Sequence, residues 1–230
     1  MQSGLFRRRI LLALVLLPLL GGCSSYVFGP KKVGSSSHLE FQDEGKDKLV
    51  GDATMALYKE GTIGVLVGWE HSFQAGNDSK DQIYNRIYRG AVRFDVDPLV
   101  APPAKTVTKA ILSYTVQNGA KSSSKGSPES CATKLLLATE GWLGAPETDI
   151  TKAPDTIPGD LYKDGLPEKP VGSIIRIDVT DAVKAWTTGA KPNYGFVFAG
   201  STEEKGLIKD NDKCWTLLGG FSLRVNYSKL

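Results

Sequence analysis

Apolar and polar residues alternate along one stretch of the chain, and the period then changes from that of a strand to that of a helix. Ile175, Ile177 and Val179 alternate with polar residues, which predicts a strand with one buried face. Val183 and Trp186 then follow Val179 at i+4 and i+7, so the same apolar face continues along a short amphipathic helix.

The ends of this helix are marked by residues that commonly cap helices. Asp178 or Thr180 is expected to accept a backbone N–H at its start, and Gly189 suits its end. Because Trp186 lies on the apolar face, we expect its indole to lie in the core of the domain.

Other parts of the chain have the pattern of short strands separated by turns. These segments are residues 62–69, 91–96, 107–116, 134–139, 194–199 and 221–227. Segment 194–199 is apolar on both faces and is therefore expected to be central. Residues 144–170 contain five prolines and no period, which predicts an irregular excursion.

Many short strands and one helix favour an all-β fold over alternating strand and helix units. We predict one jelly-roll-like antiparallel β-sandwich domain over residues 50–230, with one short helix and no second domain or internal repeat.

The N-terminus has the pattern of an export signal over residues 1–22. Arg7, Arg8 and Arg9 precede an apolar run over residues 10–20, which is too short to span a bilayer. The sequence LGGCS at residues 20–24 resembles the lipobox of bacterial lipoproteins. The resemblance implies acylation of Cys23, attachment to a membrane and, from the serine that follows, location at an outer membrane or cell surface. An ordinary signal peptide is the alternative.

Residues 23–49 are expected to form a flexible tether. They include a Gly-Pro pair, three consecutive serines and a run of mixed charge, without a sustained apolar period.

Charge gives no reason to expect a nucleic-acid partner. The formal net charge is +3, but three arginines lie in the signal segment, so the remaining chain has 28 − 3 = 25 basic and 25 acidic residues.

Two cysteines, Cys131 and Cys214, remain after Cys23. An exported protein meets an oxidising compartment, so we expect them to form a disulfide that contributes on the order of 4 kcal/mol. Metal binding is the weaker alternative, because no histidine lies near either cysteine in the sequence.

Several segments resemble the DNRLRE family of extracellular domains, which are jelly-roll sandwiches akin to carbohydrate-binding modules. They are residues 89–96 (RGAVRFDV), 107–116 (VTKAILSYTV), 178–189 (DVTDAVKAWTTG) and 193–198 (NYGFVF). The similarity covers residues 89–200, and it implies this fold and an extracellular binding role. Residues 50–88 and the cysteine pair depart from the family pattern.

The chain has none of the common catalytic signatures, such as a nucleophile elbow, a Walker loop or HExxH. His38 falls in the tether, and His71 is expected in a solvated loop. We therefore predict that the protein is not an enzyme. Hydrolysis of a polysaccharide by Asp95 and Asp97, expected on one face of a strand, is an alternative.

We expect no cofactor beyond, at most, a structural Ca²⁺. Its candidate ligands are Asp78, Asp81, Asp95 and Asp97, because carboxylate oxygens are the ligands that Ca²⁺ prefers.

Tryptophans beside loops are candidates for carbohydrate binding, because an exposed indole can stack on a sugar ring. Trp69 and Trp142 are the candidates, whereas Trp215 is expected to cover the disulfide next to it. The sequence thus predicts a surface lipoprotein with a non-catalytic binding or structural module, whose partner is an envelope protein or a polysaccharide.

Overall fold

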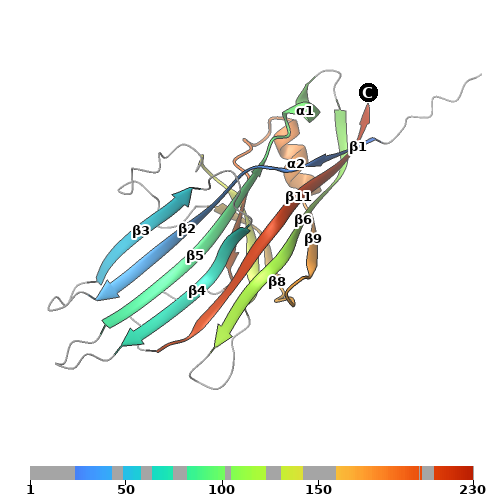
Figure 1. The fold of residues 1–230 in the computed structure, drawn as a ribbon. Coiled ribbons are helices and arrows are strands. Elements are labelled where there is room, and N and C mark those ends of the chain that lie inside the picture. Colours follow the sequence, from blue (N-terminus) through green and yellow to red (C-terminus); the bar gives the residue numbers. More distant parts are fainter. Residues whose placement is uncertain are drawn as a thin grey trace, which may run out of the picture.

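Antiparallel strands make up most of the computed structural model, which describes residues 24–42, 49–57, 64–74, 82–101, 105–122, 131–141, 159–201, 203 and 210–229 (Figure 1). The strands are β1 (Ser24–Phe28), β2 (Pro30–Gln42), β3 (Leu49–Leu57), β4 (Gly64–Gln74), β5 (Gln82–Phe94), β6 (Lys105–Ser122), β7 (Thr133–Ala138), β8 (Gly159–Leu166), β9 (Ile174–Asp178), β10 (Phe196–Gly200) and β11 (Lys213–Lys229). The helices are α1 (Asp97–Val100) and α2 (Thr180–Thr187).

The described strands form one sheet, and eight of them follow the order β8-β7-β10-β5-β4-β11-β6-β9, while β1, β2 and β3 pair off this path. Strand β5 pairs with β4 through residues 82–88 and with β10 through residues 90–92, while β2 runs along its other edge. This exchange of neighbours lets the sheet curl, so that β10 faces β6 and β11 across a shared core. The curled sheet confirms the predicted all-β sandwich.

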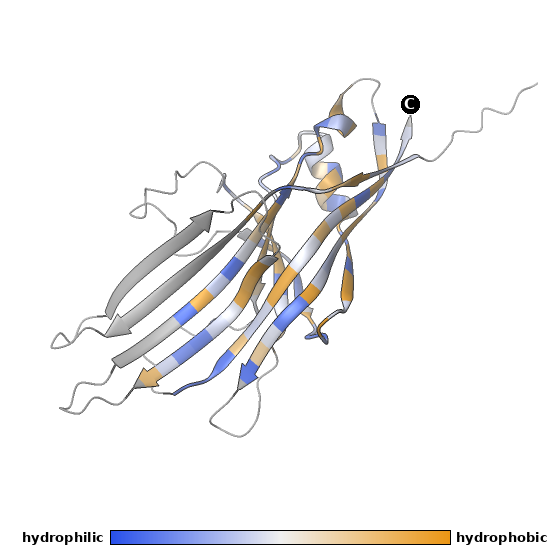
Figure 2. Ribbon diagram, viewed as in Figure 1, coloured by the Kyte–Doolittle hydropathy of each residue, from blue (hydrophilic) through white to orange (hydrophobic). Residues whose placement is uncertain are grey.

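Aromatic side chains join the two layers of the sandwich. The Phe198 ring on β10 lies 5.1 Å from Tyr114 on β6 and 5.5 Å from Phe221 on β11, measured between centroids. Figure 2 shows apolar and polar residues alternating along β11 and β6, as expected of strands with one buried face. Fully burying a phenylalanine contributes about 1.5–3 kcal/mol, so this cluster is a major part of the core.

Helix α2 closes one side of this core and confirms the helix expected from the sequence. Val183 is fully buried, and the Trp186 ring lies 4.9 Å from that of Phe196. Neither Asp178 nor Thr180 is the cap, because the N-cap residue is Val179, which makes no side-chain cap hydrogen bond. The Asp178 carboxylate, one residue earlier, accepts hydrogen bonds from the Thr180 backbone N–H and hydroxyl at 3.0 and 2.6 Å. Gly189 follows the helix at a φ of 75°, a conformation that favours glycine.

Strand β10 is buried on both faces, which confirms the central position predicted for residues 194–199. Val197 and Ala199 point away from the main core and form a second buried cluster with Ala91, Leu136 and Ala138.

The predicted tether is wrong for residues 24–42. They form β1, which pairs with β11, and β2, which pairs with both β3 and β5. Strand β8 likewise lies within the stretch predicted to be irregular, and α1 was not expected. These strands have weak apolar alternation, so backbone pairing with distant strands decides their conformation.

Replacing Trp186 by alanine should lower the free energy of unfolding by about 3–5 kcal/mol, because a large buried side chain leaves a cavity. Urea unfolding followed by circular dichroism measures the change. Lys184→Ala is the control, since Lys184 lies exposed on the same helix. Equal stability of the two variants would contradict the core position of the indole.

Alkaline pH should weaken the fold through Tyr114. Burial raises the pKa of its phenol from 10.0 to about 12, against a smaller lowering by a hydrogen bond with the Thr133 side chain. The folded state keeps this proton longer than the unfolded chain, so the stabilisation is complete below about pH 10 and is lost as pH rises towards 12. Two pKa units correspond to on the order of 2–3 kcal/mol.

Denaturant midpoints measured between pH 9 and pH 12 test this expectation. The midpoint of Tyr114→Phe should fall less steeply over this range than that of the unmodified protein. Identical slopes would show that Tyr114 does not titrate differently in the folded state.

Candidate functional site

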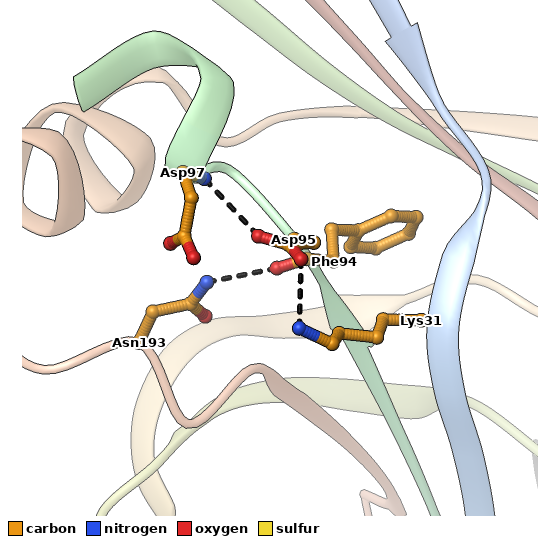
Figure 3. A network of polar contacts seen from close by, with 5 residues as sticks. All are labelled: Lys31, Phe94, Asp95, Asp97 and Asn193. Carbon is orange, nitrogen blue, oxygen red and sulfur yellow. Dashed lines mark hydrogen bonds and ion pairs between the residues drawn. The ribbon is translucent and has the colours of Figure 1, made fainter. Parts of the chain in front are cut away.

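The predicted pair of carboxylates does not lie on one strand. Strand β5 ends at Phe94, and Asp97 already begins α1, so Asp95 lies in the turn between them (Figure 3). The Asp95 carboxylate accepts hydrogen bonds from Lys31 Nζ at 2.7 Å and from the Asp97 backbone N–H at 3.2 Å. The hydrogen bond from Lys31 is the main cause that lowers the pKa of Asp95.

This polar network has the arrangement of a structural turn. Asn193 Nδ2 donates to the Phe94 carbonyl at 2.8 Å, which ties the segment before β10 to the end of β5 (Figure 3). Within the described ranges, no group of three or more His, Cys, Asp or Glu residues is placed to hold a metal. Asp78 and Asp81, the other two predicted calcium ligands, lie outside them.

Trp69 is buried against a disulfide and cannot stack on a sugar, so that prediction was wrong. The disulfide joins Cys131 and Cys214, as expected, with their Cα atoms 5.2 Å apart. Trp69 pairs with Cys214 between β4 and β11, and its side chain is only 5% exposed. The indole and the two cysteines form one small buried cluster.

His71 extends this cluster and is not in a solvated loop, contrary to expectation. It is 3% exposed, and its ring stacks on that of Trp69 at 4.4 Å. Its Nδ1 lies 3.1 Å from a carboxylate oxygen of Asp210, and its backbone N–H donates to the Asp212 carbonyl at 2.7 Å. These contacts hold the segment before β11 against β4.

Trp215, expected to cover the disulfide, faces the opposite way. Neighbouring residues of a strand point to opposite faces, so a buried Cys214 requires Trp215 to face outwards. It is half-buried and lines a hollow of about 170 Å³ together with Lys121 and Glu168. Glu168 accepts hydrogen bonds from Lys121 Nζ at 3.0 Å and from the Cys131 backbone at 3.3 Å. The strand alternation around Cys214 could have revealed this orientation from the sequence.

A larger groove, of about 430 Å³, crosses the outer face of β1, β11, β6 and β9. We call it the outer groove. Its lining combines apolar, hydroxyl-bearing and cationic side chains: Val27, Ile111, Ser113, Thr115, Ile174, Arg176, Ser222 and Arg224, with Tyr114 and Gly220 completing it.

Strand register brings these side chains together. Arg224 on β11 lies opposite Val27 on β1 and Ile111 on β6. One row along, Ser113 lies between Ser222 on β11 and Arg176 on β9. The two arginines therefore flank a strip of β6, a relation that no local sequence pattern reveals.

The outer groove carries positive charge. Arg176 and Arg224 are exposed, and neither forms an ion pair with any residue that the structure describes. Asp178 lies further along β9, where its carboxylate is engaged by Thr180. The arrangement can therefore bind an anionic group between two guanidinium groups, each with several N–H donors.

No family model matches the chain, and no curated protein is similar to it. The resemblances to the DNRLRE family and to the lipobox therefore stay predictions. Cys23 and Trp142 lie outside the described residues. Among the helices that the structure describes, none is long and apolar enough to cross a membrane.

Replacing Trp69 or Trp215 by alanine should distinguish the buried tryptophan from the outward-facing one. Trp69→Ala should lower the free energy of unfolding by about 3–5 kcal/mol, whereas Trp215→Ala should cost clearly less because its indole is already partly exposed. Chemical unfolding under oxidising conditions measures both values. A larger cost for Trp215→Ala would contradict the orientations described here.

Proposed function

We propose that the protein is a surface lipoprotein whose sandwich is a non-catalytic binding module, and that the outer groove binds an acidic polysaccharide. The observation that carries the proposal is that two exposed arginines, Arg176 and Arg224, lie on the two sides of a hydroxyl-lined strip of sheet and form no ion pair with any described residue.

The chemistry of the groove matches such a ligand. Arginine binds carboxylates with two parallel hydrogen bonds, which suits the uronate groups of acidic polysaccharides. The hydroxyls of Ser113, Ser222 and Thr115 suit sugar hydroxyls, and Ile111 and Ile174 offer apolar contacts for the C–H faces of sugar rings.

The groove is also well placed to keep its side chains in position. Its residues lie on paired strands, which hold side chains more rigidly than loops do. Three neighbouring strands span roughly 10 Å, and each additional strand adds about 4.8 Å. An extended polymer can therefore cross the strands and reach both arginines.

Binding is better supported than hydrolysis. Asp95 and Asp97, the carboxylate pair that a hydrolase was expected to use, belong to a turn at the end of β5, and Asp95 is paired with Lys31. The outer groove has arginines and hydroxyls where a glycosidase needs two carboxylates.

Membrane attachment would come from Cys23. Two or more acyl chains on one residue give stable anchoring, because each buried CH₂ contributes about 0.8 kcal/mol. We infer an outer-membrane or surface location from Ser24, which follows the acylated cysteine.

Replacing either arginine should weaken binding to an acidic polysaccharide. Arg176→Gln and Arg224→Gln should each raise the Kd for polygalacturonate at least tenfold, and binding should weaken with salt because the contacts are ionic. Affinity gel electrophoresis or calorimetry with the disulfide-bonded protein measures this, with dextran as the neutral polymer.

Lys184→Gln is the matched control, since it removes one exposed positive charge on α2, away from the groove. It should bind as the unmodified protein does. If all three variants bind polygalacturonate equally, the outer groove is not the site. If Trp215→Ala alone loses binding, the site is the hollow beside Trp215.

A further inference from the structure

Strand pairing begins at the residue next to the predicted acylation site. Ser24, which follows Cys23 directly, pairs with Tyr227 near the end of β11, and Phe28 pairs with Leu223. The Tyr26 ring stacks on that of Tyr227 at 5.2 Å, and Phe28 packs against the main core. The start of β1 is therefore part of the sandwich.

This pairing removes the distance that a tether would provide. A flexible segment over residues 23–49 would reach roughly 90 Å if fully extended. The observed pairing begins at Ser24, so only one Cα–Cα step of about 3.8 Å separates Cys23 from the sheet. If Cys23 is acylated, the sandwich cannot stand away from the lipid without breaking the pairing of β1 with β11.

An acylated Cys23 would therefore bring one particular end of the sandwich to the lipid. Figure 1 shows the start of β1, the end of β11 and α1 together at one end, with the free ends of β4 and β2 at the other. We call the first the anchor end. The strand register supports the same grouping. Lys229 at the end of β11 pairs with Lys105 at the start of β6, the strand that follows α1.

Exposed apolar side chains lie near the anchor end. Tyr26 is 37% exposed, Val27 60% and Val100, at the end of α1, 54%. A tyrosine with a polar tip and an apolar ring suits the boundary between headgroups and acyl chains. The anchor end thus offers an apolar contact where the geometry brings lipid.

We propose that the acylated protein docks end-on against a lipid bilayer, with Tyr26 and Val100 at the interface and the far ends of β4 and β5 directed away from it. The proposal rests on the acylation of Cys23 that is part of the proposed function. The outer groove then lies beside the membrane, because Val27, one of its lining residues, is only four residues from the anchor.

Fluorescence quenching by lipid measures the orientation. The full-length acylated protein is reconstituted into phosphatidylcholine vesicles that contain lipids spin-labelled at the headgroup. A fluorophore is attached either at Val100→Cys or at Ser72→Cys, an exposed position near the far end of β4. We expect quenching at position 100 to exceed that at position 72 several-fold.

A linker variant tests the physical cause. Twenty Gly and Ser residues inserted between Cys23 and Ser24 restore a tether, and the difference in quenching between the two labels should then largely disappear. If the label at position 100 is as weakly quenched as that at position 72 without the linker, end-on docking is overturned.

Whether Cys23 is acylated shows which proposal has failed, the end-on docking alone or the lipoprotein proposal as well. Mass spectrometry should show the acyl chains, and Cys23→Ser should release the protein from vesicles. Absence of acylation would overturn both proposals. Acylated, vesicle-bound protein with equal quenching at the two positions would overturn only the docking.

Discussion

The register of β11 is the constraint on which most of this structure depends. Its backbone pairs with β6 along its length and, on the other edge, with β4 and then β1. Because side chains alternate with a period of two, this register sends Leu223 and Val225 into the core and Ser222 and Arg224 to the outer groove. A shift by one residue would exchange these two sets.

The two ends of β11 serve different purposes. At its start, the disulfide of Cys214 ties β11 to Cys131 in the segment just before β7, and Trp69 and His71 cover it from solvent. At its end, β1 adds the segment that follows Cys23. The disulfide and the proposed acylation site therefore lie at opposite ends of β11, and the outer groove lies between them.

If Cys23 is acylated as we propose, the pairing of β1 with β11 would keep the sandwich close to the membrane. The proposed ligand surface is made of strand residues, and its charge comes from Arg176 and Arg224 on strands far apart in sequence. This explains how a chain with 25 basic and 25 acidic residues from residue 23 onwards can present a locally positive surface.

The sequence by itself determined the elements whose pattern is local: the alternation of β6 and the end of β11, the buried face of α2, and the disulfide, which follows from two remaining cysteines. Tertiary structure decided that residues 24–42 are strands, that Trp69 and His71 are buried, and that Arg176 lies near Arg224. The physical reason is that the period of apolar residues shows which face of a strand is buried. Which other strand pairs with it is set by backbone hydrogen bonds to distant residues, and these leave no pattern in the local sequence.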